Sequence, residues 1–234
     1  MACKLICLLG TKLNTKGVSM VAKKSSIVLL LLILVSYGCA GVPVREATKV
    51  DMSLQVGEIE GNQFRGIRYP FKVSAPSGWQ MATKYPDFMV ALGYDKDGLE
   101  ESQLFIFNPV TQSNVQIDLE PAGRHTTFSQ GLMEGLVSAA GTDSFIEEIE
   151  KDYGKEAQPV MAPTEAIRLK GVQYAARKYA TYTLKGVKRE QGWVYAFSEP
   201  YQMFILYMLL DTGGTRDQEA LEAIFDSFEY IPKK

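Results

Sequence analysis

Reactive side chains are scarce in this chain of 234 residues, which has three cysteines and one histidine. Cys3 and Cys7 precede Cys39, and no cysteine follows it. A chain that begins at Cys39 therefore has no second thiol for a disulfide or a redox pair. His125 is the single histidine, whereas zinc and iron sites usually recruit several histidine or cysteine ligands. These shortages exclude thiolate chemistry downstream of Cys39 and argue against a transition-metal centre.

Catalytic signatures are also missing. The sequence contains no Gly-x-Ser-x-Gly elbow, no phosphate-binding glycine loop and no dinucleotide fingerprint. We therefore expect neither an enzyme nor a cofactor. A hydrolase built on two carboxylates stays open, because any two of the 27 acidic residues can meet in a cleft. We interpret Glu147, Glu148 and Glu150 as the solvent face of a short helix.

Apolar runs are short, and the one near the amino terminus has a recognisable context. Ile27–Tyr37 supplies 11 mostly apolar residues, whereas a membrane-spanning helix needs about 20. Lys23 and Lys24 precede this run, and the small residue Gly38 stands before Cys39. A positive segment, a short apolar core and a small residue at the cut are typical of an export signal.

The end of this signal resembles the lipobox of bacterial lipoproteins. Ser36 stands where leucine is usual, and Tyr37 is bulkier than usual, so ordinary signal cleavage and an uncleaved anchor remain alternatives. The resemblance implies cleavage between Gly38 and Cys39 and attachment of acyl chains to Cys39, which hold the protein to the membrane. One chain binds a membrane marginally, whereas two or three bind firmly.

Two further expectations concern location and the start of translation. In Gram-negative lipoproteins, a residue other than aspartate after the cysteine directs the protein to the outer membrane, and Ala40 has that position. The resemblance thus implies the periplasmic face of the outer membrane if the host is Gram-negative. A start at Met20 rather than Met1 gives a signal of ordinary proportions.

Removal of residues 1–38 leaves 196 residues, a length that suits one domain. The remaining chain has 20 basic and 27 acidic residues, a net charge of −7. A nucleic-acid partner is not expected, because nucleic acids attract basic surfaces. We expect residues 39–50 to form a lipidated tether and residues 51–234 a single globular domain.

The apolar pattern predicts strands and helices from Met52 onward. Strands are expected at 53–59, 64–75, 89–94, 104–107, 115–119, 165–169, 172–184, 189–197 and 201–210. Helices are expected after a capping box at Thr127 and Gln130, over 143–153, and after a capping box at Thr215 and Gln218. The first helix has its apolar stripe at Phe128, Leu132, Leu136 and Ala140, and the last at Leu221, Ile224, Phe225 and Phe228.

These elements predict the α+β class. Most strands follow one another through tight turns, which favours an antiparallel sheet. The strand at 201–210 is apolar almost throughout, and successive side chains of a strand alternate between its faces. Such a strand must be covered on both sides, so we expect helices on both faces of the sheet.

Three segments carry a family resemblance: Tyr69–Trp79 (YPFKVSAPSGW), Gly171–Ala176 (GVQYAA) and Ile224–Tyr230 (IFDSFEY). Together they resemble the PsbP-like fold of the extrinsic PsbP subunit of photosystem II, a Ran-binding nuclear import factor and many small bacterial lipoproteins. The resemblance implies an α/β/α sandwich and a non-enzymatic module that docks on a larger complex. The three segments are packing motifs, so no functional residue is carried over.

The leading functional hypothesis is a lipid-anchored cell-envelope protein whose domain binds another envelope protein or assists assembly. A small-molecule or lipid carrier is the alternative and requires an apolar pocket of roughly 300–1,000 Å³. Smaller signals have plainer interpretations: Asp95–Glu101 as a hairpin turn rather than a calcium loop, and Arg124–His125 as a surface loop rather than an anion site. We interpret Trp79, Trp193 and Tyr195 as core residues rather than the lining of a ligand groove.

Overall fold

The computed structural model describes residues 46–96, 104–124, 126–140, 142–210 and 216–232. All of them belong to one compact unit, Pro43–Lys234. Gly38 and Cys39, and with them the expected cleavage and lipidation, lie outside the described residues, as do His125 and Thr215. Among the helices of the described part, none has the length and apolarity to cross a membrane.

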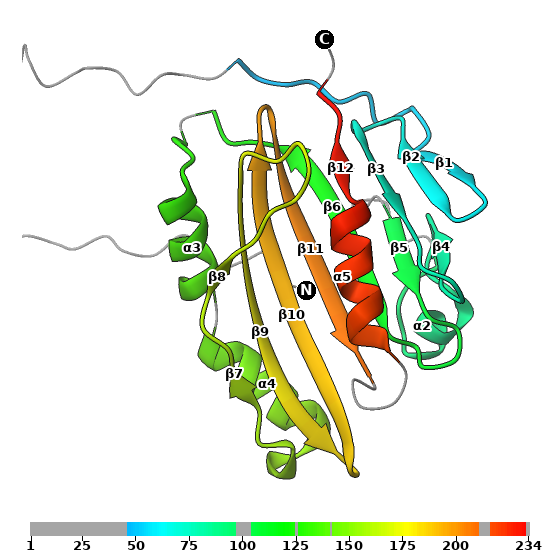
Figure 1. Cartoon of the computed structure of the whole chain (residues 1–234), viewed down its shortest axis with the longest axis vertical. Helices are drawn as coiled ribbons and strands as arrows, with labels where there is room; N and C mark the ends of the chain where they lie inside the picture. Colours follow the sequence, from blue (N-terminus) through cyan, green and yellow to red (C-terminus); the bar gives the residue numbers. More distant parts are fainter. Residues whose placement is uncertain (1–45, 97–103, 125, 141, 211–215, 233–234) are drawn as a thin grey trace, which may run out of the picture. The chain divides into compact units, whose positions relative to one another are not determined.

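An antiparallel sheet of eight strands forms the centre of this unit (Figure 1). Its order is β4 (Gln80–Ala82), β5 (Leu104–Phe107), β6 (Asn114–Pro121), β11 (Tyr201–Leu209), β10 (Val187–Ser198), β9 (Tyr174–Leu184) and β7 (Val160–Met161), and β8 (Glu165–Ala166) also pairs with β9. Lys185 and Gly186 join β9 to β10 with φ angles of 51° and 81°, the positive values that a two-residue hairpin turn needs. The predicted α+β class with an antiparallel sheet is confirmed.

A second sheet of four strands packs against the first. Its order is β1 (Gly57–Glu60), β2 (Gln63–Gly66), β3 (Phe71–Ser74) and β12 (Glu229–Tyr230). The single strand predicted over 64–75 is wrong, because the chain reverses between β2 and β3. A Cβ atom on Gly66 would lie 2.1 Å from the carbonyl oxygen of Tyr69. Only glycine permits this close turn. Gly66 was therefore the sequence signal for the reversal, although the apolar alternation on either side of it looks like one continuous strand.

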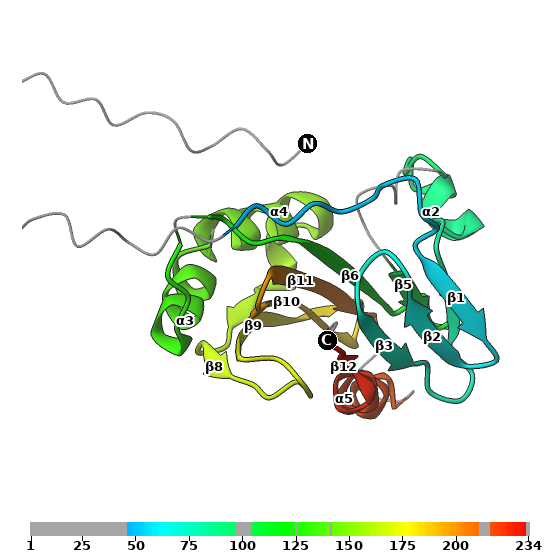
Figure 2. The same ribbon diagram turned by 90° about the horizontal axis from the view of Figure 1, so that it is seen from above.

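One face of the eight-stranded sheet, called here the α5 face, is covered by α5 (Asp217–Ser227) and by the small sheet (Figures 1 and 2). Leu221, Ile224 and Phe225 of α5 share one apolar cluster with Val194 and Ile205 of the sheet. Phe64, Phe71 and Phe228 are fully buried in the same cluster. This cluster is the main core of the domain.

The opposite face, called the α3 face, carries the other helices, and Figure 2 shows the sheet between the two helical layers. They are α2 (Asp87–Ala91), α3 (Gln130–Ala139), α4 (Thr142–Tyr153) and the short 3₁₀ turn η2 (Lys155–Ala157). Met133 and Val137 of α3 pack with Trp193 of β10, and Ile149 of α4 packs with Tyr182 of β9. Helices on both faces are therefore confirmed, as is the helix predicted over 143–153.

Two local predictions on the α3 face are wrong. The segment 89–94 is not a strand, because Asp87–Ala91 forms α2 after Pro86 in the extended N-cap position. A proline followed by an acidic first turn is a helix start. In α3 the cap is Ser129, which accepts a hydrogen bond from the Leu132 amide, and not the predicted Thr127. The helix starts later than expected, so its buried side chains are Met133 and Val137, and Leu136 is exposed.

The strand predicted over 165–169 is also wrong in length, because only Glu165 and Ala166 pair with β9. Residues 167–173, called here the arch, continue without strand structure. The amide of Tyr230 donates to the carbonyl of Lys170 in the arch, and Ser198 donates to the carbonyl of Gly171. A Cβ atom on Gly171 would lie 2.2 Å from the Tyr230 carbonyl oxygen. The arch is thus bound to β12 as a fixed part of the fold.

Candidate functional site

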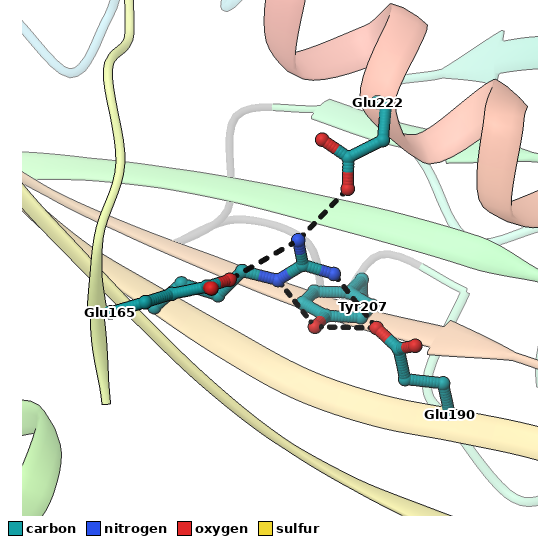
Figure 3. Close-up of polar contacts among 5 residues, drawn as sticks. Glu165, Glu190, Tyr207 and Glu222 are labelled. Carbon is teal, nitrogen blue, oxygen red and sulfur yellow. Dashed lines mark hydrogen bonds and ion pairs between the residues drawn. The ribbon is translucent and has the colours of Figure 1, made fainter. Parts of the chain in front are cut away.

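A buried arginine on the α5 face binds three carboxylates. Arg177 of β9 is 6% exposed, and its Nη2 lies 2.7 Å from Oε1 of Glu190, which is itself 2% exposed. Its Nη1 lies 2.9 Å from Oε1 of Glu222 on α5 and 3.6 Å from Oε1 of Glu165 on β8. Figure 3 shows these side chains converging from α5, β8 and the sheet. We call Arg177, Glu165, Glu190, Glu222 and Tyr207 the arginine cluster.

Tyr207 of β11 completes the arginine cluster. Its hydroxyl accepts from Nε of Arg177 at 2.8 Å and donates to Glu190 at 3.0 Å. Burial raises the pKa of Tyr207 above its ordinary value, so the phenol keeps the proton that it donates. A Cβ atom on Gly192 would lie 2.5 Å from this hydroxyl, so the glycine in the middle of β10 makes room for it.

Aromatic rings surround the guanidinium. Its carbon lies 4.8 Å from the ring centroid of Tyr179, 5.1 Å from that of Tyr207 and 5.5 Å from that of Phe225. A desolvated arginine over aromatic faces gains cation–π attraction in addition to its ion pairs. The cluster therefore joins β8, β9, β10, β11 and α5 through one side chain.

The arginine cluster is arranged as a clamp rather than as a pair of catalytic acids. Glu165 and Glu222 both have an oxygen on Nη1 of Arg177, so the guanidinium stands between the two carboxylates. A general acid needs a carboxyl that can hold and release a proton to a substrate. Glu147 and Glu148 are exposed on α4, as expected, whereas Glu150 is half-buried. No pair that fits the two-carboxylate hydrolase is therefore formed by these acids.

A groove of about 860 Å³ lies between the arch, α5 and the first turn of α3. It is open on one side and lined by apolar residues, such as Leu169 and Phe225, together with the polar Arg168, Lys170 and Asp226. The carrier hypothesis requires a closed apolar pocket, because an acyl chain or apolar ligand must be removed from water. The groove has the volume but neither the closure nor the uniform lining.

The α3 face of the sheet contains a region that no helix of the described part covers. We call it the open strip: Gln202, Phe204, Leu206 and Met208 of β11 with Gln116, Asp118 and Glu120 of β6. Phe204 and Leu206 are 37% and 38% exposed, whereas Ile205 between them is 1% exposed on the α5 face. The two sides of β11 thus differ sharply in cover.

Covered strands lie on either side of the open strip. Next to β6, Phe105 and Phe107 of β5 pack under α2 with Met89. Next to β11, Trp193 of β10 is buried under Phe145 of α4, with ring centroids 4.9 Å apart. The strip is therefore the middle of the sheet and not its edge.

Polar contacts hold the side chains of the open strip in place. The Tyr195 hydroxyl donates to Oε1 of Gln202 at 2.7 Å, and Nε2 of Gln202 donates to Glu120. The rings of Tyr195 and Phe204 meet edge to face with centroids 6.4 Å apart. A preformed surface of this kind loses little side-chain freedom on binding.

The sequence anticipated part of this result. The apolar run at 201–210 predicts cover on both sides, and the prediction is wrong for the α3 side of β11 at Phe204 and Leu206. Trp79 and Trp193 are core residues, as interpreted. The arginine cluster was missed, although the adjacent cations Arg177 and Lys178 in the middle of the predicted strand 172–184 were its visible signal. Gly192 in a strand was a second signal.

Comparison with protein-family models and with curated proteins finds no match. Solved structures do resemble the fold. The chain is similar to the cyanobacterial PsbP (CyanoP) of Synechocystis sp. PCC 6803, with 10% identity, a TM-score of 0.45, and cover of 75% of this chain and 99% of the other. It is also similar to LpqN of Mycobacterium tuberculosis, which is involved in cell envelope biogenesis, with 11% identity, a TM-score of 0.42, and cover of 69% and 83%.

A protein of Bacteroides thetaiotaomicron VPI-5482 shares 13% identity at a TM-score of 0.39, over 75% of this chain and 50% of the other. One of these solved structures is a PsbP, the family that the sequence resembles. At these scores the likeness concerns the path of the chain alone and carries no inference about function.

Proposed function

We propose that this protein is a lipid-anchored component of the cell envelope whose domain, without catalysis, binds another envelope protein through the open strip. The occupant is a segment of that protein with apolar and basic side chains. The exposed apolar pair Phe204 and Leu206, on a strand whose sequence requires cover on both faces, carries the proposal. Exposed apolar side chains that lie together on the face of a sheet are a common component of binding sites.

The charge of the neighbouring elements supports a basic partner. The segments β6, β11 and α3 contain Asp118, Glu120 and Glu134, and their sequences contain no lysine or arginine, whereas Asp87 of α2 is already paired with Lys96. Complementary charge at the rim of an apolar contact speeds association and selects the partner. A basic segment therefore fits this surface better than a neutral or acidic one.

The proposal of a lipid anchor rests on the sequence alone. The export signal and the lipobox-like residues before Cys39 support acyl chains on that residue, with residues 39–50 as the tether, and Ala40 supports the outer membrane in a Gram-negative host. We expect Cys39→Ser to leave an unprocessed precursor and to abolish labelling by radioactive palmitate. A mature amino terminus at another residue, found by mass spectrometry, would contradict the anchor.

Binding through the open strip is tested by photo-crosslinking in cells. A benzoylphenylalanine at position 206 is expected to give a discrete adduct with one envelope protein. The matched control places the same probe at Glu219 of α5, whose side chain is 77% exposed on the opposite face. The same smear of products from both positions would show that the strip has no partner.

A further inference from the structure

The shape of the open strip indicates the secondary structure of its occupant, and this inference rests on the proposed function. We infer that the partner presents one amphipathic α-helix, with basic residues beside its apolar stripe, that lies over β6 and β11 in the gap between α2 and α3–α4. The strip accepts this helix through side chains alone. Four observations support the inference: the pairing of the strands, the width of the gap, the spacing of the apolar side chains and the charge around them.

Backbone pairing excludes strand addition at this surface. β6 is hydrogen-bonded to β5 on one side and to β11 on the other, and β11 is likewise bonded to β6 and β10. Neither strand has a free edge, so an added strand finds no backbone partner there. An extended segment laid on the face would also leave its own amide and carbonyl groups against Phe204 and Leu206. A helix satisfies those groups internally, which makes it the suitable element.

The width of the gap limits the number of helices that it can hold. From β5, which α2 covers, to β10, which α4 covers, the sheet takes three steps between neighbouring strands. Each step is about 4.8 Å, which gives roughly 14 Å. A helix with its side chains is about 10–12 Å across. Because packed helices lie about 8–10 Å apart, axis to axis, and α2 and α4 fill part of this width, the gap holds no more than one helix.

The length and spacing of the apolar side chains fit the same element. Phe204, Leu206 and Met208 point to the α3 face at every second position of β11. They span about 14 Å at 3.4 Å per residue. That distance corresponds to between two and three turns of helix, or about nine residues, so apolar residues at positions i, i+4 and i+7 cover most of it.

The acidic residues around the open strip favour basic residues on both sides of the apolar stripe of this helix. Asp118 of β6 pairs with Phe204 across the strands, and Glu120 lies two residues further along the same face. On the other side, α4 contributes five acidic residues against the single basic Lys151. An acidic helix would be repelled by these residues, and a neutral helix would gain no attraction from them. A second copy of this acidic surface would be repelled as well.

Crosslinking at three positions tests the inference in the full lipidated chain. Benzoylphenylalanine is placed in turn at Phe204, Leu206 and Met208, and the adducts are digested and sequenced by mass spectrometry. We expect the attachment points on the partner to fall three or four residues apart, with lysine or arginine between them. Attachment points two residues apart, a lipid adduct, or a second copy of this chain would overturn the helix while leaving adduct formation itself intact.

A charge variant supplies the second measurement. Glu120→Lys is expected to lower the adduct yield from position 206 by about tenfold, because it places a cation beside the basic flank. Glu219→Lys makes the same change on the opposite face and should leave the yield unchanged. An equal yield from both variants would overturn the basic helix. The absence of any adduct at all three positions would instead overturn the proposed function.

Discussion

The two faces of the central sheet are formed by the same strands but are covered to different extents. On the α5 face, Ile205 is buried in the core that the small sheet and α5 cover. On the α3 face, the next residue, Leu206, is exposed between two covered regions. A single strand thus contributes to the core with its odd positions and to the proposed binding surface with its even ones. The comparison separates residues that stabilise the fold from exposed residues that the proposal assigns to a partner.

The arginine cluster gives the largest expected effect on the closed face. Arg177→Met is expected to lower the free energy of unfolding by about 3–5 kcal/mol, because Glu190 is left as an unpaired buried charge. Urea denaturation at pH 7 measures the loss. The double variant Arg177→Met with Glu190→Leu should recover most of it, since both charges then leave the interior. If the single variant lost less than about 1 kcal/mol, the clamp would not be a major support of this face.

Neighbouring residues of β11 give the most direct comparison of the faces. Ile205→Ala is expected to cost about 2–5 kcal/mol, because it opens a cavity in the main core. Leu206→Ala should cost less than about 1 kcal/mol, because its side chain is already in contact with water. Thermal or urea unfolding of the two variants measures the ratio. Equal losses would mean that the open strip is part of the core and would remove the reason for a partner.

Much of the fold could be predicted because its elements have local signals. The alternation in β9, β10 and β11 and the helix over α4 follow from side-chain periodicity, which one segment expresses by itself. The short elements could not be placed in this way. Asp87–Ala91 is a helix of five residues, too short for a 3.6-residue period to show, and the reversal at Gly66 interrupts an alternation that looks continuous in the sequence.

The candidate site was harder to predict because it depends on contacts between distant segments. Arg177 and Glu222 are 45 residues apart in the sequence, and their pairing follows from the sheet order and the position of α5. The sequence does require cover on both sides of 201–210. It does not say that the helices of the α3 face stop short of β11, because no local pattern records where a neighbouring helix lies.

Substitution of two glycines by alanine is expected to change stability in opposite directions. Gly135 lies within α3, and a Cβ atom there would meet no atom within 4 Å, so Gly135→Ala should raise the free energy of unfolding by about 0.5–1 kcal/mol. Gly192→Ala should be destabilising, because its Cβ would lie 2.5 Å from both the Tyr179 Cβ and the Tyr207 hydroxyl. Chemical denaturation of both variants measures the opposite signs. A stabilised Gly192→Ala would show that Tyr207 does not need this space.

The smallest effect is expected at the seam where the small sheet meets the arch. Hydrogen bonds from Lys170 and then Lys72 lower the pKa of Glu229 below its ordinary value of 4.5, and the two Nζ atoms lie 2.9 and 3.0 Å from its carboxylate. A lowered pKa in the folded state adds stability above the ordinary pKa, and this contribution disappears as the pH falls through the lower value. Wild type should therefore exceed Glu229→Gln in stability at pH 7 and match it in strong acid.

Urea midpoints of wild type and Glu229→Gln, measured from pH 2 to pH 7, give the comparison. Because the lysines are exposed, added salt should reduce the stability difference at pH 7. A stability difference between wild type and Glu229→Gln that stayed constant with pH would mean that Glu229 contributes through packing rather than through its charge.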